Sequence, residues 1–139
     1  STGVESVDAV TSTADYDGDY DGVISNVTMN GKSYSDEDAT FTIESNVLIC
    51  DFPQIGKMPG TITVELPISI NEATGEITAT PGTSAGFLTL KVGGKAILYL
   101  DSLTNAKVEN GTLEFDMAVH GTYLVIIKFP ASFHFKAPK

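Results

Sequence analysis

The stretch Thr61-Ile-Thr-Val-Glu-Leu-Pro-Ile-Ser-Ile70 decides the fold, because every second residue in it is apolar. That is the period of a strand and not of a helix. The apolar side chains would all face one side of an extended chain: Ile62, Val64, Leu66, Ile68 and Ile70. Pro67 falls on the other side and has no N–H to donate, so we expect a sheet edge or a bulge at that position.

The same alternation recurs in shorter runs on both sides of this stretch, with turn signals between them. Asn30-Gly31 favours a hairpin turn. Pro53 to Gly60 contains two prolines and two glycines, which exclude a regular strand, so we expect a flap at one end of the fold. Over the whole chain, the pattern predicts about nine or ten short strands and no convincing helix, which indicates an all-β fold. An antiparallel barrel and a two-sheet sandwich both fit this pattern.

The C-terminal half gives four more specific expectations. Asp101 to Val108 would hold a short helical turn or a loop, and His120-Gly121 would turn the chain into a strand over Thr122 to Phe129. Pro130 would interrupt that strand, and Ser132 to Lys136 would follow as an exposed terminal strand.

Charge is distributed unevenly along the 139 residues. The formal net charge is −10, and residues 1–51 hold eleven Asp or Glu against Lys32 alone. Arg, the side chain that best recognises phosphates, is absent. This composition disfavours a nucleic-acid partner and an anionic membrane surface, since both need clustered positive charge. No run is long and apolar enough to predict a transmembrane helix.

Residues 1–19 are rich in Ser, Thr, Ala, Asp and Gly, and we interpret them as a flexible acidic arm. Residues 20–139 would then form a single all-β domain, which is long enough to bury its own core. The first residues lack the charged and apolar segments of a signal peptide, so we interpret the chain as a mature or trimmed form.

Asp17-Gly-Asp-Tyr-Asp-Gly22 is the densest acidic cluster and matches the first half of a calcium loop. Asp17, Asp19 and Asp21 are therefore candidate calcium ligands. The twelfth position of the loop is Thr28, so the bidentate Glu of an EF-hand is missing. The alternative is a solvated acidic linker. No other cofactor is expected.

Three residues deserve consideration as catalytic groups. Gly82-Thr-Ser-Ala-Gly86 matches a nucleophile elbow around Ser84, but a strand and not a helix is expected to follow it. We expect His120 to be a turn residue and His134 an outward-facing strand residue, and the sequence places no carboxylate or nucleophile beside either of them. We therefore predict that the protein is not an enzyme. Cys50, the single cysteine, is expected to be a small buried apolar residue.

Aromatic residues are concentrated near the C-terminus, at Tyr123, Phe129, Phe133 and Phe135. The simplest interpretation is packing in the core and at strand edges. The alternative is a stacking face for a sugar ring or the lining of an apolar pocket.

Four short segments together carry a family resemblance: Tyr20-Asp-Gly-Val-Ile24, Met29-Asn-Gly-Lys32, Phe41-Thr-Ile43 and Asp51-Phe52. They resemble the calycin-like (lipocalin-like) β-barrel domains of uncharacterised exported lipoproteins of gut Bacteroidetes, mainly over residues 20–70. The resemblance implies an exported protein of the periplasm or bacterial cell surface, with a lipidated Cys upstream of the arm. The chain has no Trp, so it lacks the Gly-x-Trp signature of true lipocalins, and the resemblance assigns no functional residues.

The sequence and the resemblance together predict a calycin-like barrel first and a sandwich second. The expected function is a non-catalytic cell-envelope protein that binds a small molecule, lipid or glycan, with the Pro53 to Gly60 connection gating the barrel mouth. The alternative is a structural or assembly module that joins another chain through exposed strand edges such as Ser132 to Lys136. Membrane contact is expected only through an upstream lipid anchor.

Overall fold

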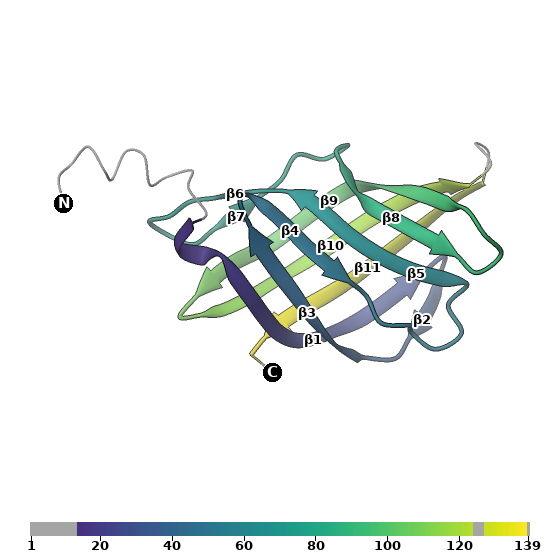
Figure 1. The fold of residues 1–139 in the computed structure, drawn as a ribbon, viewed down its shortest axis with the longest axis horizontal. Coiled ribbons are helices and arrows are strands. Elements are labelled where there is room, and N and C mark those ends of the chain that lie inside the picture. The colour runs from purple at the N-terminus through teal and green to yellow at the C-terminus, as the bar shows by residue number, and fades with distance from the viewer. Residues whose placement is uncertain (1–13, 124–126, 139) are drawn as a thin grey trace.

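The computed structural model describes residues 14–123 and 127–138, and these confirm the all-β prediction (Figure 1). One short 3-10 helix precedes the strands. The elements in chain order are η1 (Ala14–Tyr16), β1 (Gly18–Met29), β2 (Lys32–Tyr34), β3 (Glu37–Glu44), β4 (Val47–Asp51), β5 (Gly60–Pro67), β6 (Ser69–Ile70), β7 (Ile77–Thr78), β8 (Ser84–Leu90), β9 (Lys95–Glu109), β10 (Thr112–Tyr123) and β11 (Ile127–Ala137).

Eight strands form the wall of a closed antiparallel barrel, in the order β11-β10-β9-β8-β5-β4-β3-β1. The last strand pairs with the first, with Val23 opposite Lys136, and this pairing closes the ring. Figure 1 shows the purple β1 beside the yellow β11. β2 extends the sheet beside the end of β1, and β6 pairs with β7 in a separate two-stranded sheet. The fold is therefore the predicted calycin-like barrel and not the sandwich.

Short polar turns set the pairing of neighbouring strands. Asn30-Gly31 and Asn110-Gly111 each form a two-residue connection, and all four residues have positive φ. Positive φ at both central residues defines the type I′ turn, whose twist matches that of the flanking strands. The hairpin predicted at Asn30-Gly31 is confirmed.

The alternating side chains of the central stretch fill the barrel interior. Ile62, Val64, Leu66, Ile68 and Ile70 are at most 6% exposed. The stretch is two strands and not one, since β5 ends at Pro67. Pro67 pairs with Val47 on one side only, because the pairing of β5 with β8 stops at Val64. The expectation of a sheet edge at the proline is confirmed.

Aromatic rings occupy the middle of the core. The ring centroids of Phe41 and Phe135 lie 4.6 Å apart, and those of Phe52 and Phe133 lie 4.9 Å apart. Phe115 contacts three of these rings. Such spacings are those of favourable aromatic pairs. Phe129, Phe133 and Phe135 are buried, so the core interpretation of the C-terminal aromatics is confirmed for these three; the side chain of Tyr123 lies outside the described residues.

The prediction of a helical turn or loop at Asp101 to Val108 was wrong. β9 runs through this segment without a break, from Lys95 to Glu109. A bulge lies near Asn105, whose φ is 52°, and the pairing with β10 shifts there. An extra residue in a bulge interrupts the two-residue alternation of apolar side chains, so the sequence pattern looked irregular where the strand continues.

The expected boundaries between the last strands were also wrong. His120-Gly121 is not a turn, since both residues pair within β10. Gly121 instead allows the Phe129 ring to lie directly against the backbone, where a Cβ atom would overlap it. Pro130 does not interrupt β11, and its carbonyl accepts a hydrogen bond from Asn30 N–H at 2.8 Å. Ser132 to Lys136 is no exposed edge, because it pairs with β10 on one side and β1 on the other.

The two ends of the barrel are covered differently. At one end, which we name the closed end, the β6–β7 hairpin folds over the core and buries Ile68, Ile70 and Ile77. The Val108 amide donates to the Gly75 carbonyl at 2.9 Å and fixes this hairpin to β9. η1 also lies here, with the Tyr16 hydroxyl donating to the Glu72 carbonyl at 2.8 Å. The folded part therefore begins slightly before residue 20, and the predicted arm lies outside the described residues for positions 1–13.

The connection over residues 53–60 covers the opposite end, as the flap prediction requires. Ile55 and Met58 are 1% exposed and point into the core. The Gln54 side-chain amide donates to the carbonyls of Gly56 and Met58, both at 3.0 Å. These bonds give the connection a defined shape although it contains no strand.

Candidate functional site

A pocket of about 570 Å³ opens at the end of the barrel that the 53–60 connection covers. Its apolar wall comes from β1, β8 and β11, and its polar rim comes from the β1–β2 hairpin and the 53–60 connection. The residues that line it are Met29, Asn30, Lys32, Tyr34, Lys57, Pro59, Leu88, Leu90 and Phe129. Its size lies within the usual range for sites that bind small molecules.

The barrel architecture places these side chains together from distant parts of the sequence. Met29 ends β1 and Lys32 begins β2 across the Asn30-Gly31 turn. Leu90 lies opposite Gly60, so the end of β8 lies beside the 53–60 connection. The Lys91 amide donates to the Pro59 carbonyl at 3.1 Å and holds the two segments together.

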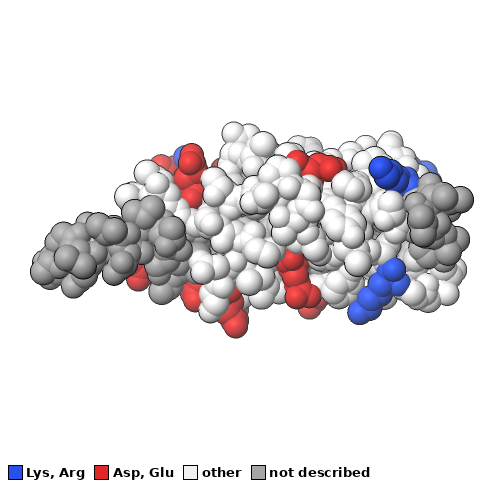
Figure 2. Space-filling view, turned by 90° about the horizontal axis from the view of Figure 1, so that it is seen from above, with Lys and Arg blue, Asp and Glu red and all other residues white. Residues whose placement is uncertain are grey.

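Lysines surround this pocket. Lys32 and Lys57 line it, while Lys91, Lys95 and Lys128 are exposed on adjoining segments; we name the region defined by these five residues the lysine end. On the face drawn in Figure 2, most of the lysine atoms lie at the right, and the carboxylates lie at the centre and left, with a smaller lysine area beside the left-hand carboxylates. Within the part of the chain that the structure describes, Lys32 and Lys57 form no ion pair. Their charges are therefore available to an anionic ligand.

The closed end carries the opposite charge. A groove of about 850 Å³ lies on the outside of the barrel there, between the β6–β7 hairpin and strands β9 to β11. Four carboxylates line it, at Glu76, Glu109, Glu114 and Asp116. Lys107, which also lines the groove, is paired with Glu109 at 2.9 Å.

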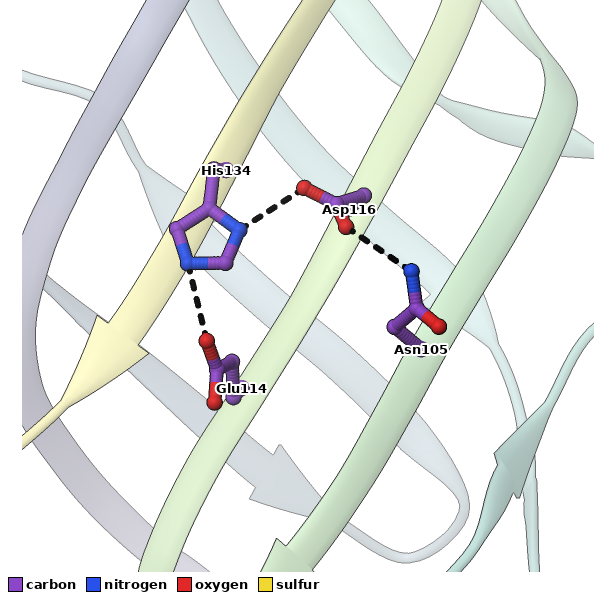
Figure 3. A network of polar contacts seen from close by, with 4 residues as sticks. All are labelled: Asn105, Glu114, Asp116 and His134. Atoms are coloured by element: carbon purple, nitrogen blue, oxygen red, sulfur yellow. Dashed lines mark hydrogen bonds and ion pairs between the residues drawn. The ribbon is translucent and has the colours of Figure 1, made fainter.

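His134 connects two carboxylates in this groove (Figure 3). Its Nδ1 lies 2.7 Å from Asp116 Oδ1, and its Nε2 lies 3.1 Å from Glu114 Oε2. The imidazole can donate to both carboxylates only when both ring nitrogens carry protons. Asn105 Nδ2 donates to the other oxygen of Asp116 at 3.3 Å. The network links β9, β10 and β11 on the outer face of the wall.

The surroundings of Asp116 shift its pKa. Partial burial alone would raise the pKa of this carboxyl group. The hydrogen bonds from His134 and Asn105 and the charge of His134 outweigh burial, so the pKa of Asp116 is lowered from its usual value. Hydrogen bonds and an opposite charge favour the ionised form of a carboxyl group.

His120 also has a carboxylate partner, but Ser84 does not lie beside it. Its Nδ1 lies 2.7 Å from Asp101 Oδ1. Ser84 begins β8 opposite Tyr99, and Tyr99 lies opposite His120, so a whole strand separates the serine from the histidine. A serine nucleophile needs a base within hydrogen-bonding distance. The structure therefore does not assemble the elbow pattern around Ser84 into a triad, and a strand follows it as expected.

The three candidate calcium ligands lie outside the barrel near the closed end. Asp17 precedes β1, and Asp19 and Asp21 alternate along it with exposed side chains. Thr42 Oγ1 donates to Asp19 and Thr40 Oγ1 donates to Asp21, each at 2.6 Å. Residues two apart in a strand lie about 6.6 Å apart, so these carboxylates do not converge as a calcium loop does. Among the described residues, no group of three His, Cys, Asp or Glu is arranged to hold a metal ion. Calcium binding at these positions stays a prediction.

Cys50 is buried, as the sequence predicted, and 2% exposed. Burial, with a smaller contribution from the charge of Asp51, raises the pKa of its thiol to about 12. A thiol with so high a pKa is unreactive near neutral pH.

The sequence did not reveal either the lysine end or the carboxylate partners of the histidines. The sequence did contain a clue to the partners of His134. Glu114 and Asp116 alternate on the outward face of β10, and β10 pairs with β11, which carries His134. Pairing Phe115 with Phe135 places Asp116 opposite His134. The pairing could not be assigned because the turn was expected at His120-Gly121.

Comparisons with known proteins find no relative. No family model matches the chain, no curated protein matches it, and no solved structure matches it. The closed antiparallel barrel is consistent with the calycin-like resemblance at the level of the fold. Among the described residues, no helix has the length and apolar character needed to span a bilayer.

Proposed function

We propose that this protein is a non-catalytic binding protein for a small apolar ligand that carries an anionic group. One observation carries the proposal. The pocket at the lysine end combines apolar walls with two lysines, Lys32 and Lys57, that have no ion-pair partner among the described residues. Ligand sites commonly combine apolar linings with a few polar groups that fix orientation.

The chemistry of the pocket defines the ligand class. Met29, Leu88, Leu90 and Phe129 would take the apolar part of the ligand out of water, which is the main favourable term in such binding. The lysines at the rim would pair with a carboxylate, sulfate or phosphate group. Phenylalanine rings fill the barrel centre, so the ligand would lie across the mouth and beside the 53–60 connection.

An apolar anion fits this site better than a glycan does. Sugar rings stack on exposed aromatic faces, whereas the largest group of rings in the described chain lies inside the barrel. The resemblance to exported calycin-like lipoproteins supports a cell-envelope location for such a protein. Lipid anchoring through a Cys upstream of residue 1 belongs to the same proposal.

Calorimetric titration with dodecanoate tests the proposal, and dodecan-1-ol serves as the uncharged comparison. We expect the wild-type chain to bind dodecanoate and to bind the alcohol more weakly. The double variant Lys32→Gln/Lys57→Gln should bind dodecanoate roughly 10-fold more weakly, because each exposed charge pair contributes up to about 1 kcal/mol.

Lys107→Gln/Lys136→Gln is the matched control. It removes the same charge from residues outside the pocket and should keep the wild-type affinity. If the wild-type chain does not bind dodecanoate, or if both double variants lose affinity equally, the proposed site is wrong.

The rival proposal is an assembly module that uses strand edges. The closed wall leaves β2 and the β6–β7 hairpin as edges among the described strands, and β2 has three residues. Such short edges offer few backbone groups for strand addition. Light scattering that shows concentration-dependent oligomers without added ligand would favour the rival.

A further inference from the structure

The hairpin that projects from the lysine end differs from the rest of the surface in its charge. Residues 77–100, which include β8 and β9 up to Leu100, contain no Asp or Glu, although the chain has 18 of them. The turn of this hairpin, Lys91-Val-Gly-Gly-Lys95, has a lysine on each side. The hairpin is therefore locally basic in an acidic protein.

Apolar exposure is concentrated on the same hairpin. Val92 is 86% exposed and Ile97 is 51% exposed, and they are the exposed large apolar side chains of the described chain. The positions that a Cβ would take at Gly93 and Gly94 have no neighbouring atom within 4 Å. Val92 therefore sits on a tip that projects into solvent and not in a hollow.

Further lysines lie at the rim of the neighbouring pocket and on the hairpin itself. Lys57 belongs to the connection that the Lys91 amide contacts through Pro59, and Lys32 lies across the pocket from it. Lys95 lies over the Phe87 ring, 4.3 Å from its centroid, on the outer face of the hairpin. The acidic start of β3 is set back from this end, because Glu37 pairs with Ile24 in the middle of β1.

We propose that the lysine end docks onto an anionic lipid bilayer, with Val92 entering the headgroup layer. A projecting apolar tip flanked by cations matches a surface that is negatively charged and apolar beneath. A nucleic acid would leave the apolar tip unused, and the chain has no Arg to read its phosphates. A bilayer also accepts a convex tip, whereas a folded protein partner would need a matching hollow.

The net charge of −10 does not prevent this contact. The wall strands span the barrel, and the 12 residues of β10 extend about 40 Å. The Debye length is about 8 Å at physiological ionic strength, so acids at the closed end are screened from a surface at the lysine end. Net charge in the sequence disfavoured membranes because it could not show that the charges separate along the barrel. η1, the first element that the structure describes, lies at the opposite end of the barrel.

Vesicle sedimentation with the full chain tests the inference. The probe is phosphatidylcholine vesicles with 30% phosphatidylglycerol, against vesicles of phosphatidylcholine alone, in about 50 mM salt. We expect binding to the anionic vesicles, weaker binding to the neutral ones, and a steady loss as salt rises. Absence of binding to the anionic vesicles at low salt would overturn the inference.

Two variants separate the contribution of the lysine charges to vesicle binding from that of the apolar tip. Lys91→Gln/Lys95→Gln should weaken binding roughly 30-fold, since each basic residue near an anionic surface contributes about 1 kcal/mol. Val92→Ser should weaken it roughly 10-fold through lost apolar burial. Lys107→Gln/Lys136→Gln removes equal charge at other positions and should keep wild-type binding. Equal losses in both double variants would show attraction to charge alone and overturn the inference.

The same variants distinguish this surface from the ligand site. Val92→Ser leaves the residues that line the pocket unchanged, so it should bind dodecanoate with wild-type affinity while losing vesicle binding. Unchanged vesicle binding of Val92→Ser together with wild-type dodecanoate affinity would contradict the docking geometry and leave the pocket proposal standing.

Discussion

The two ends of the barrel share the same eight strands and differ in charge and in cover. The closed end buries Ile68, Ile70 and Ile77 under a hairpin and carries carboxylates on its outer groove. The lysine end has a pocket with apolar walls, two lysines at its rim that form no ion pair among the described residues, and an exposed valine on a projecting turn. Each end buries apolar side chains under a cover, but the exposed large apolar side chains of the described chain, Val92 and Ile97, lie on the hairpin at the lysine end. We therefore expect substitutions at the closed end to affect stability most, and the binding proposed above to depend on the lysine end.

Matched truncations should break or sharpen this comparison most clearly. Ile70→Ala removes a fully buried side chain at the closed end and should lower the free energy of unfolding by roughly 2 to 5 kcal/mol. Leu90→Ala removes a partly exposed side chain from the pocket and should cost less than about 1 kcal/mol, while weakening dodecanoate binding. Urea unfolding measures both free energies. Equal costs would show that the two ends contribute alike to stability.

Glycine substitutions test the same contrast through the backbone. Gly75 has a φ of +78°, and a Cβ there would overlap the Val108 carbonyl oxygen that faces the β6–β7 hairpin. Gly75→Ala should therefore cost roughly 3 kcal/mol, from backbone strain and a displaced hairpin. Gly93 has a φ of +96° and open space around it, so Gly93→Ala should cost about 1 to 2 kcal/mol from backbone strain alone. Thermal unfolding of the two variants measures the difference, and a larger loss for Gly93→Ala would contradict the assignment of the hairpin as a structural cover.

The fold could be predicted because the period of apolar residues reports which side of a strand is buried. The stretch ending at Ile70, the Asn30-Gly31 turn and the 53–60 cover all follow from local chemistry. The wrong strand boundaries were predicted at residue types that can have either of two structural roles. Gly121 and Pro130 usually mark breaks, but here one makes room for an aromatic ring and the other lies in a strand whose partner does not need its missing N–H.

The candidate sites depend on pairings between distant segments, which a single sequence does not specify. Lys32, Lys57 and Lys91 are separated by 25 to 59 positions, and only barrel closure brings them to one end. The acidic cluster around Asp19 could be recognised because its residues are contiguous in the sequence. The positive charge of the lysine end comes from lysines that are isolated in the sequence and form no local motif. The same reason explains why His134 could not be matched to Asp116 before the last hairpin was located.

The smallest expected effect concerns the His134 network at the closed end. The lowered pKa of Asp116 means that the folded chain binds a proton at this carboxyl group less tightly than the unfolded chain does. Its contribution to stability is therefore fully present above the unfolded pKa of about 3.9 and is lost as pH falls through the lower folded value. Because the carboxylate is partly exposed, we expect less than about 1 kcal/mol. Urea unfolding from pH 2 to 7 should show a shallower acid decline for Asp116→Asn. If His134 lowers the pKa of Asp116, the double variant Asp116→Asn/His134→Gln should show the same acid decline as Asp116→Asn alone. If the acid decline of Asp116→Asn equals that of the wild-type chain, the network does not contribute to stability at the closed end.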